Sequence, residues 1–372
     1  MERGSTNRDV RLTNRKVVVN TLFHSEPMTK QDLVIKTGLS LPTINYILKD
    51  LTAQGLITQG EKLDSSGGRP ASYIQPVFDS GYSIGINVSE NCVRIAMSDL
   101  APKLLSKDKS PMAFEDTKEY WTAVNSLLKQ FIAKNSVNPS KLLGISLSLT
   151  SAITLHEEKA SYFNNQRIDQ LDLVQVRNYF DHDITITNSS KMAGFAQAWG
   201  AMETEDIVYL TMNETIGGAI MSKRDVLNFS SKNAMFGHMS IEKDGRKCSC
   251  GKKGCLDAYC STRALTGLSG TTLDEFFEGV DTGNPAYQAI LEDYLIHLAV
   301  GINDIRVIFD TDIVIGGEMS TYLQRYIERL QELLREMNPF GDPGTYARIG
   351  KYGEYDSSVG AGLVHNNRRL SS

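Results

Sequence analysis

Long hydrophobic runs are missing from this chain of 372 residues. No apolar stretch approaches the ~18 residues that a bilayer-spanning helix needs, so the sequence excludes a membrane protein. The opening residues MERGSTNRDVRLTNRK are polar and charged, without the apolar stretch of a secretory signal. We therefore expect a protein of the reducing cytoplasm. Its length exceeds the ~250–300 residues at which single cores stop growing, which predicts two or three domains.

Cysteine is scarce and unevenly placed. The chain has five cysteines, and four of them lie between positions 248 and 260. In a reducing compartment, clustered cysteines are more often metal ligands or catalytic thiols than disulfides. The C-x-C spacing differs from the C-x-x-C redox motif, which leaves metal binding as the favoured interpretation. One imidazole and three thiolates form a known structural zinc set, here His238, Cys248, Cys250 and Cys255.

Two glycines support this predicted zinc site. Gly251 and Gly254 allow a short loop to fold back so that the three sulfurs point inward. Four protein ligands leave no open coordination position, so the ion is predicted to be structural rather than catalytic. Cys92 and Cys260 lie outside the set, and we expect both to be buried free thiols.

An excess of positive charge is also missing. The net charge of −5 argues against a general binder of polyanions. The charge is uneven, since residues 1–80 contain ten Lys and Arg against eight Asp and Glu, whereas residues 81–372 contain 29 against 36. Phosphate neutralisation needs local positive charge, so contact with nucleic acid is expected only in the N-terminal segment.

Three short helices are predicted in that segment. The first starts at Asn14, ends before Pro27 and has apolar spacing at Val17, Val18, Thr21 and Leu22. Thr29 is the expected N-cap of the second helix, with Asp32 completing a capping box and Gly38 stopping the helix. Ser40 is the expected N-cap of the third helix, which ends near Gly55. Its apolar stripe consists of Ile44, Ile47, Leu48 and Leu51.

Three helices with a glycine in the turn before the third are typical of a helix-turn-helix. The following LITQGEKLDSSGGRPASYIQP, residues 56–76, reads as strand, turn and strand, which predicts a β-hairpin wing. An amphipathic helix of an enzyme cap would show the same stripe as the third helix, but the wing and the basic bias favour DNA. The expected DNA contacts are Ser40, Pro42, Thr43, Asn45, Tyr46 and Lys49.

The stretch SSGGRPAS, residues 65–72, is interpreted as a linker that joins this module to the rest of the chain. Arg69 lies between glycine and proline in this stretch. Negative potential in a narrow minor groove attracts arginine, so Arg69 is a further expected DNA contact.

From Gly81 onwards, strand and helix patterns follow one another, which is typical of an α/β protein. In a first round, strands are expected at 81–89, 92–100 and 141–154, with a helix at 119–135. A second round consists of a strand and helix at 184–200, two strands at 206–221, helices at 272–308, a strand at 311–320 and a last helix near 358–366. Two rounds predict a two-lobed body. We divide the chain into a winged helix-turn-helix with linker (1–76), a first α/β lobe (77–190) and a second lobe with the zinc loop and the C-terminal helices (191–372).

Several motifs together resemble the ROK family (repressors, open reading frames, kinases). They are the winged helix with its Gly-Arg-Pro segment, GYSIGINVS, NETIGGAI, FGH and CSCGKKGC. The similarity runs from about Asn14 to Leu363 and is greatest to the branch of xylose and N-acetylglucosamine repressors. It implies an actin-like/hexokinase-like body, with a sugar cleft between the two lobes, in a dimer or tetramer.

The resemblance also shows departures from the kinases of the family. Their Asp-x-Gly-Gly-Thr phosphate loop corresponds here to residues 87–91, Asn-Val-Ser-Glu-Asn, and their Gly-Thr-Gly loop to residues 213–215, Asn-Glu-Thr. Their catalytic Asn-Asp pair corresponds to Asn188 and Ser189, and a serine hydroxyl cannot accept a proton as a carboxylate does. We therefore predict that the chain is not an enzyme.

The sugar site implied by the resemblance is altered as well. Met235 and Asp257 stand where the kinases have glutamates. Asn188, His238 and Asp257 remain as expected contacts of an effector. Met235 is equally compatible with a cleft that has lost its ligand and is filled as core.

The sequence thus predicts a transcriptional repressor of carbohydrate-utilisation genes. As a homodimer or tetramer it would bind palindromic double-stranded DNA under the control of a sugar-like effector. A ROK sugar kinase with an appended helical domain is the alternative function. A body that binds a transporter or another regulatory protein is a third.

Overall fold

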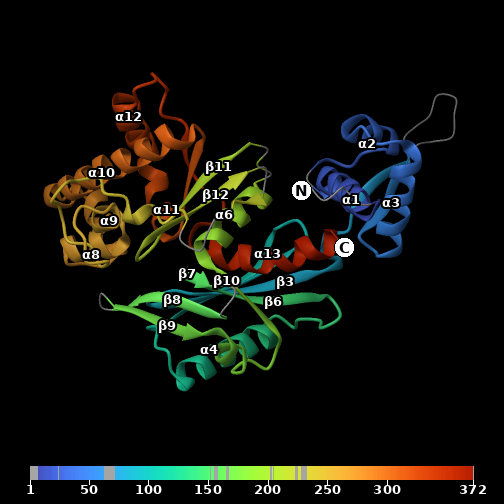
Figure 1. The fold of residues 1–372 in the computed structure, drawn as a ribbon, viewed down its shortest axis with the longest axis horizontal. Helices are drawn as coiled ribbons and strands as arrows, with labels where there is room; N and C mark the ends of the chain where they lie inside the picture. The colour runs from blue at the N-terminus through green and yellow to red at the C-terminus, as the bar shows by residue number, and fades with distance from the viewer. Residues whose placement is uncertain are drawn as a thin grey trace, which may run out of the picture.

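The computed structural model describes residues 7–23, 25–62, 72–150, 152–154, 158–164, 167–201, 203, 205–222, 225–227 and 233–371. Helices and strands alternate through most of this length, and two five-stranded sheets dominate it (Figure 1). Among the described residues, no helix is both long and apolar enough to cross a membrane.

An N-terminal module contains three helices and a two-stranded antiparallel sheet. They are α1 (Asn7–Phe23), α2 (Lys30–Thr37), α3 (Leu41–Ala53), β1 (Ile57–Lys62) and β2 (Ser72–Pro76). The capping box of Thr29 and Asp32 is confirmed, and Gly38 ends α2 with a left-handed φ of 69°. The four residues of the predicted stripe are the buried residues of α3.

Two predictions for this module were wrong. Helix α1 begins at Asn7 rather than Asn14, and Val17 of its predicted apolar face is 38% exposed. Val18 and Leu22 of the predicted face are buried as expected, together with Arg15, Val19 and Phe23. The stretch 65–72 does not join two domains, because β2 pairs with β1 and residues 63–71 therefore connect two strands of one sheet. That connection, including Arg69, lies outside the described residues.

The module is close to the body in sequence and in space. Only the 3₁₀ helix η1 (Phe78–Ser80) separates β2 from the first strand of the body. The ring of Phe23 at the end of α1 packs edge-on against Phe78, with 5.8 Å between ring centroids. A single hydrophobic cluster contains residues of the module and of the body, so the module is packed onto the body.

The first lobe contains a five-stranded sheet in the order β10-β6-β3-β4-β5. The strands are β3 (Tyr82–Val88), β4 (Cys92–Asp99), β5 (Leu104–Pro111), β6 (Leu142–Leu149) and β10 (Ile184–Asn188). β3 pairs antiparallel with β4 and parallel with β6. Both β3 and β4 are buried along almost their whole length, as expected for central strands that are covered on both faces. Helix α4 (Lys118–Lys134) contributes Trp121, Val124 and Leu128 to the core of this lobe.

One strand was predicted over 141–154, but β6 ends at Leu149. The region after β6 contains a separate three-stranded antiparallel sheet, β7 (Ala152–Thr154), β8 (Lys159–Asn164) and β9 (Arg167–Asp172), followed by the short helix α5 (Leu173–Arg177).

The second lobe contains a sheet in the order β13-β12-β11-β14-β15. Its strands are β11 (Ile207–Met212), β12 (Ile216–Ser222), β13 (Asp225–Val226), β14 (Asp312–Gly316) and β15 (Ala347–Ile349). Helix α6 (Ser189–Gly200) packs on β11 and β12. The other elements of this lobe are η2 (Phe236–His238), α7 (Asp257–Cys260), α8 (Thr262–Ser269), α9 (Leu273–Asp281), α10 (Pro285–Phe309), α11 (Glu318–Leu323), η3 (Gln324–Tyr326), α12 (Ile327–Met337) and η4 (Gly353–Tyr355).

The last helix, α13 (Asp356–Ser371), is longer than expected. It follows the second lobe in sequence, yet it packs on β3 and β6 of the first sheet and on α6. Figure 1 shows it lying between that sheet and α6, with its C-terminal end beside the N-terminal module.

Candidate functional site

The exposed face of α3 contains most of the predicted DNA contacts. Ser40 caps the helix, because its hydroxyl accepts the backbone N–H of Thr43, and Pro42 lies in the first turn. Asn45, Tyr46 and Lys49 are exposed, and Tyr46 has 65% of its surface accessible. A tyrosine this exposed on a helix with a buried apolar stripe has no role in the core.

A hydrogen bond links the exposed face of α3 to α2. The Nζ of Lys30 donates to Asn45 Oδ1 over 2.9 Å. The sequence pattern did not indicate this pair, because the two residues lie on different helices.

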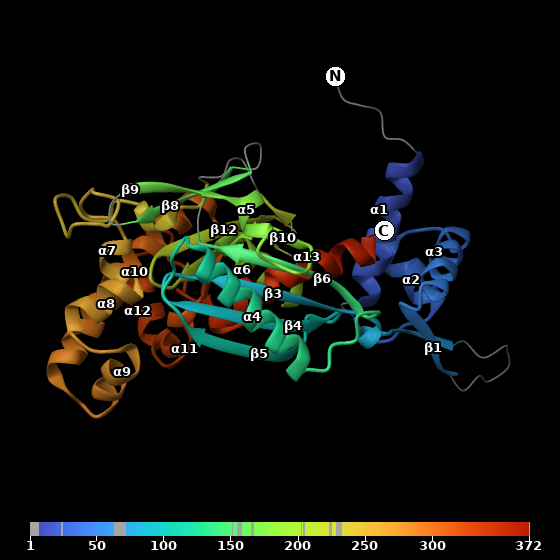
Figure 2. The ribbon, with the colours of Figure 1, turned by 90° about the horizontal axis from the view of Figure 1, so that it is seen from below.

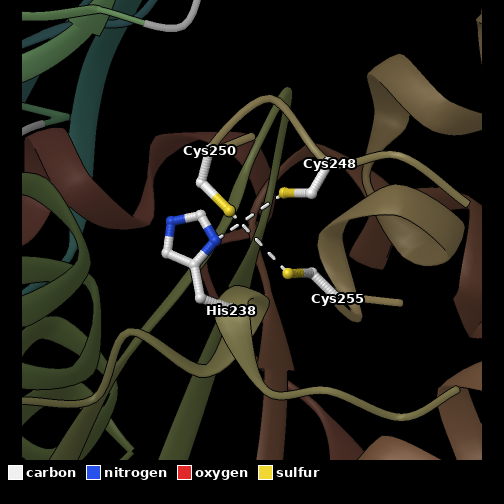
Figure 3. Close-up of side chains that lie close together, drawn as sticks. All are labelled: His238, Cys248, Cys250 and Cys255. Carbon is white, nitrogen blue, oxygen red and sulfur yellow. Dashed lines mark hydrogen bonds between the residues drawn. The ribbon is translucent and has the colours of Figure 1, made fainter. Parts of the chain in front are cut away.

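One histidine and three cysteines converge between η2 and α7. His238 ends η2, Cys248 and Cys250 lie on the loop, and Cys255 precedes α7 (Figure 3). One ligand atom from each side chain lies within 4.8 Å of the other three. The structure therefore brings together all four residues that were predicted to bind a metal.

The spacing of these atoms fits a tetrahedral ion. Two sulfur ligands at ~2.3 Å from a tetrahedral zinc ion lie ~3.8 Å from each other. Cys250 Sγ lies 3.8 Å from Cys255 Sγ, and Cys248 Sγ lies 3.8 Å from His238 Nδ1. Three thiols and an imidazole are also the donor atoms that zinc prefers.

The loop folds back through two glycines, as predicted. Gly251 and Gly254 have φ values of 88° and 76°, a region that other residues rarely adopt. A Cβ on Gly254 would lie 1.7 Å from the carbonyl oxygen of Glu242. The turn is closed by the N–H of Cys248, which donates to the Lys252 carbonyl over 2.8 Å.

Burial and the neighbouring thiols Cys248 and Cys250 together raise the pKa of the Cys255 thiol to about 12. Three thiolates this close would repel each other, and a divalent cation between them would remove that cost. The electrostatics of the cluster therefore favour a bound cation.

Two of the predicted effector residues also have structural roles. Asp257 is buried at the start of α7, where its Oδ1 accepts the Ile216 N–H over 2.7 Å. Burial raises the pKa of Asp257, and the nearby His238 opposes that rise. Asn188 ends β10 and caps α6 by accepting the Lys191 N–H over 3.1 Å. Asp257 and His238 thus belong to the second lobe, whereas Asn188 lies at the edge of the first, so a shared ligand would lie between the lobes.

Ser189, beside Asn188, is buried in a polar cluster. Its Oγ accepts a hydrogen bond from Asn87 Nδ2 over 2.7 Å, and the same amide donates to Ser148 Oγ over 3.1 Å. Ser189 is therefore held by the residues around it and lacks a neighbouring carboxylate among these partners.

Charged side chains join the two lobes, and the sequence pattern did not indicate their pairing. Arg94 of β4 is 2% exposed and pairs with Glu318 of α11 and with Glu354 of η4. Lys109 of β5 pairs with the same two carboxylates, at 3.1 Å and 2.7 Å. The signal that was available is an arginine within the apolar strand pattern CVRIAMSDL, which has no reason to be buried without partners.

A cavity of about 560 Å³ lies beside these ion pairs, and the turn between β3 and β4, α8, α9 and α11 contribute to its lining. Arg94, Lys109 and Arg263 line it, and each of these three cations is paired with a carboxylate. Glu214 also lines the cavity and accepts a hydrogen bond from Ser89.

Comparisons with known proteins place these features in a family. A family model described as "ROK family" matches residues 83–365. The xylose repressor of Bacillus subtilis (strain 168) is 23% identical over 316 residues, which cover 82% of each chain.

Two solved structures share the fold. A ROK family transcriptional regulator, described as a homologue of the Escherichia coli MLC protein, superposes with a TM-score of 0.74 at 15% identity and covers 97% of both chains. A ROK family glucokinase from Streptomyces griseus, solved with glucose and AMPPNP, gives a TM-score of 0.64 at 18% identity over 76% of this chain and 99% of that chain. The predicted actin-like/hexokinase-like body, with mixed α/β content, is thereby confirmed.

Proposed function

The chain belongs to the ROK family, and from that premise we propose that it is a sequence-specific DNA-binding repressor of carbohydrate-utilisation genes. On this proposal α1, α2, α3, β1 and β2 form a winged helix-turn-helix, with α3 as the recognition helix. Such a regulator acts where the DNA is, in the cytoplasm.

The observation that carries the proposal is the polar, exposed face of α3 on a helix whose other face is buried. A recognition helix enters the major groove and needs donors, acceptors and apolar contacts at its surface. Asn45 supplies an amide donor and an amide acceptor, Tyr46 an apolar ring, and Lys49 a positive charge for phosphate. The names of the B. subtilis relative and of the MLC-like structure, a repressor and a transcriptional regulator, point the same way.

The geometry between the lobes disfavours phosphoryl transfer. A kinase needs free positive charge and backbone N–H groups for the phosphates and a carboxylate for the sugar hydroxyl. Here the lining cations are paired with carboxylates, Glu214 adds negative charge, and buried Ser189 accepts its hydrogen bond from an amide.

We assign the control of DNA binding to a homodimer, or a tetramer of such dimers, with one recognition helix per half-site. A palindrome requires two recognition helices about one or more helical turns apart, ~34 Å per turn. An effector held by Asn188, His238 and Asp257 would contact both lobes. It would shift the dimer between two geometries, provided that its affinity differs between them.

We also propose a structural zinc ion at His238, Cys248, Cys250 and Cys255. With all four positions filled by protein, zinc would supply rigidity rather than Lewis-acid chemistry. The imidazole of His238 would then connect the braced loop with the effector site, because His238 is also close enough to Asp257 to oppose its pKa rise.

The proposal is tested by selecting binding sequences from a random pool of double-stranded DNA. The selected DNA is then titrated by fluorescence anisotropy at several salt concentrations, with and without a panel of sugars and sugar phosphates. We expect a palindromic sequence, binding that weakens steeply with salt, and release by one class of sugar. Failure to enrich any sequence would overturn the proposal.

The kinase alternative is tested on the same preparation. We expect no sugar-dependent release of ADP from ATP over a panel of hexoses and amino sugars. Turnover that disappears when Asn188 is changed to Ala would establish the kinase instead.

A further inference from the structure

Helix α13 connects the cleft with the N-terminal module. Its last turn lies against α1, as both views show (Figures 1 and 2). The hydrophobic cluster that contains Val18 and Leu22 of α1 also contains Val359, Leu363 and Leu370 of α13. A helix of 16 residues spans ~24 Å, so a single rigid element reaches from the lobes to the module.

Two arginines add hydrogen bonds to the apolar contact between α13 and the module. Arg15 of α1 is 6% exposed and donates its Nε–H to the carbonyl oxygen of Leu370 over 3.2 Å. Its guanidinium also pairs with Asp50 of α3 and donates to Gln54 Oε1 over 3.1 Å. From the other side, Arg369 donates to the backbone oxygen and to Oε1 of Gln54 over 3.1 Å and 3.3 Å. The end of the recognition helix is therefore held directly by α13.

The other end of α13 is fixed to the second lobe. Asp356 is 1% exposed, and its Oδ2 accepts hydrogen bonds from the Tyr209 hydroxyl over 2.8 Å and from the Gly317 N–H over 2.9 Å. Tyr209 belongs to β11, and Gly317 follows β14. These bonds secure the start of the helix at the centre of the second sheet.

Close backbone contacts hold the first turns of α13 between the lobes. A Cβ on Gly85 of β3 would lie 1.8 Å from the carbonyl oxygen of Ser358, and a Cβ on Gly360 would lie 1.8 Å from that of Met192 in α6. The helix thus touches the first lobe on one side and the second lobe on the other without intervening side chains. Packed interiors deform little, so a rotation of one lobe against the other must move α13 relative to at least one of them.

We propose that Arg369 and Arg15 are positioning residues for DNA recognition, through which α13 sets the orientation of α3 according to the geometry of the lobes. This inference rests on the proposed function, since it requires that α3 reads DNA. Neither residue needs to touch a base. Their effect is on the distance and angle between the two recognition helices of a dimer.

A positioning role would change the affinity for a full palindrome more than the affinity for a single half-site. A purely structural role would change both affinities together. Binding to one half-site depends on the surface of α3, whereas binding to a full palindrome also depends on how two copies of α3 are placed. Binding to the second half-site is an intramolecular step, and its advantage is lost when the geometry prevents both contacts from forming.

The test compares Arg369→Gln with Arg368→Gln on the full-length chain. Arg368 is the neighbouring, exposed arginine in the same turn, so its substitution removes the same charge. Anisotropy titrations would use the selected palindrome, a single half-site, and palindromes whose half-sites are moved apart in steps of one base pair. Arg15→Gln is the second variant, and Arg369→Lys keeps a donor for the Gln54 carbonyl.

We expect Arg369→Gln and Arg15→Gln to weaken binding to the palindrome roughly tenfold to a hundredfold. They should also flatten the preference for one spacing, while affinity for a single half-site changes less than about twofold. Arg368→Gln should keep the spacing preference, and Arg369→Lys should restore part of it.

An equal loss of affinity for the half-site and for the palindrome would assign the arginines to phosphate contact or folding and overturn the inference. An unchanged spacing profile would overturn it as well, whereas a wild-type chain that binds no selected DNA would overturn the proposed function itself.

Discussion

His238 lies where it would contribute to both the proposed metal site and the proposed effector site. Its Nδ1 faces the three thiols, and the residue is also near enough to Asp257 to affect the pKa of that buried carboxyl. A bond from His238 to a cation would fix the ring, and with it one wall of the expected effector site. Removal of the metal is therefore expected to affect effector response as well as stability.

The proposed metal ligands can be tested one residue at a time. We expect Cys250→Ser to lower the zinc content to well below one ion per chain. It should also lower Tm by several degrees, since ~1 kcal/mol corresponds to ~2–4 °C for domains of this size. Zinc is measured by atomic emission on protein dialysed against a weak chelator, and Tm by calorimetry.

Cys260→Ser provides the matched control for this substitution. Cys260 is fully buried, and its Sγ lies 3.7 Å from the Tyr294 carbonyl oxygen, away from the cluster. The control should lose stability while it retains zinc. Equal zinc contents in the two variants would rule out the metal site.

The residues of the metal cluster could be predicted from sequence because they are close together and chemically unusual. The pairing of Arg94 with Glu354 could not, because 260 positions separate the two residues and the apolar pattern around Arg94 does not identify its partner. Arg15 was missed for a similar reason, since its partners Asp50 and Leu370 lie on two other helices. Sequence pattern reports local geometry, whereas these contacts depend on the tertiary fold.

Helix α3 combines two kinds of exposed side chain with different expected roles in DNA binding. Asn45→Ala should cost ~1–3 kcal/mol at one base pair of each half-site and relax the sequence preference there. Lys49→Ala should weaken binding to all sequences about equally and reduce the slope of log K against log salt by ~1. Both effects are measured by titrating single-base variants of the selected DNA at several salt concentrations.

The two substitutions of α3 serve as controls for each other, because both side chains are exposed and neither contributes to the buried stripe. A loss of preference at the same base pair in both variants would indicate a general disturbance of the helix. Circular dichroism should show unchanged helix content in both.

Elements were predictable where capping and burial act locally. Helix α2 was predicted from Thr29, Asp32 and Gly38, whose hydrogen bonds lie within one turn of the helix ends. The segment 65–72 was misread because glycine and serine are equally typical of a linker and of a long hairpin connection. Only the pairing of β2 with β1 distinguishes the two. The position of α13 in the fold could not be predicted either, because the pattern of its own residues does not indicate which lobe the helix packs against.

The ion pairs that connect β4 and β5 with α11 and η4 should make the stability of the folded protein depend on pH. Burial alone would raise the pKa of Glu354, but Lys109 and Arg94 outweigh that effect and lower it below its usual 4.5. Because the folded pKa is the lower one, ionised Glu354 stabilises the protein above about pH 4.5. That contribution is lost as the pH falls through the folded value.

The prediction is tested with Glu354→Gln by urea denaturation at about pH 6 and about pH 3.5. The wild type should exceed the variant in free energy of unfolding at the higher pH, and the difference should shrink at the lower pH. Glu328→Gln, which changes an exposed carboxylate of α12, is the control. If the difference in free energy of unfolding between wild type and Glu354→Gln stays constant with pH, Glu354 stabilises the protein through packing rather than through its charge.

The contact between Arg15 and Leu370 also has a consequence for protein synthesis, because 355 positions separate the two residues. Helices α1 to α3 contact one another and the strands β1 and β2, so these elements can associate before the last turn of α13 has been made. At ~5–20 residues per second, the ribosome then needs roughly 15–65 s to reach the last turn of α13. On the proposed function, a nascent chain would during that interval present α3 with no connection to the lobes, able to contact DNA but unable to respond to an effector.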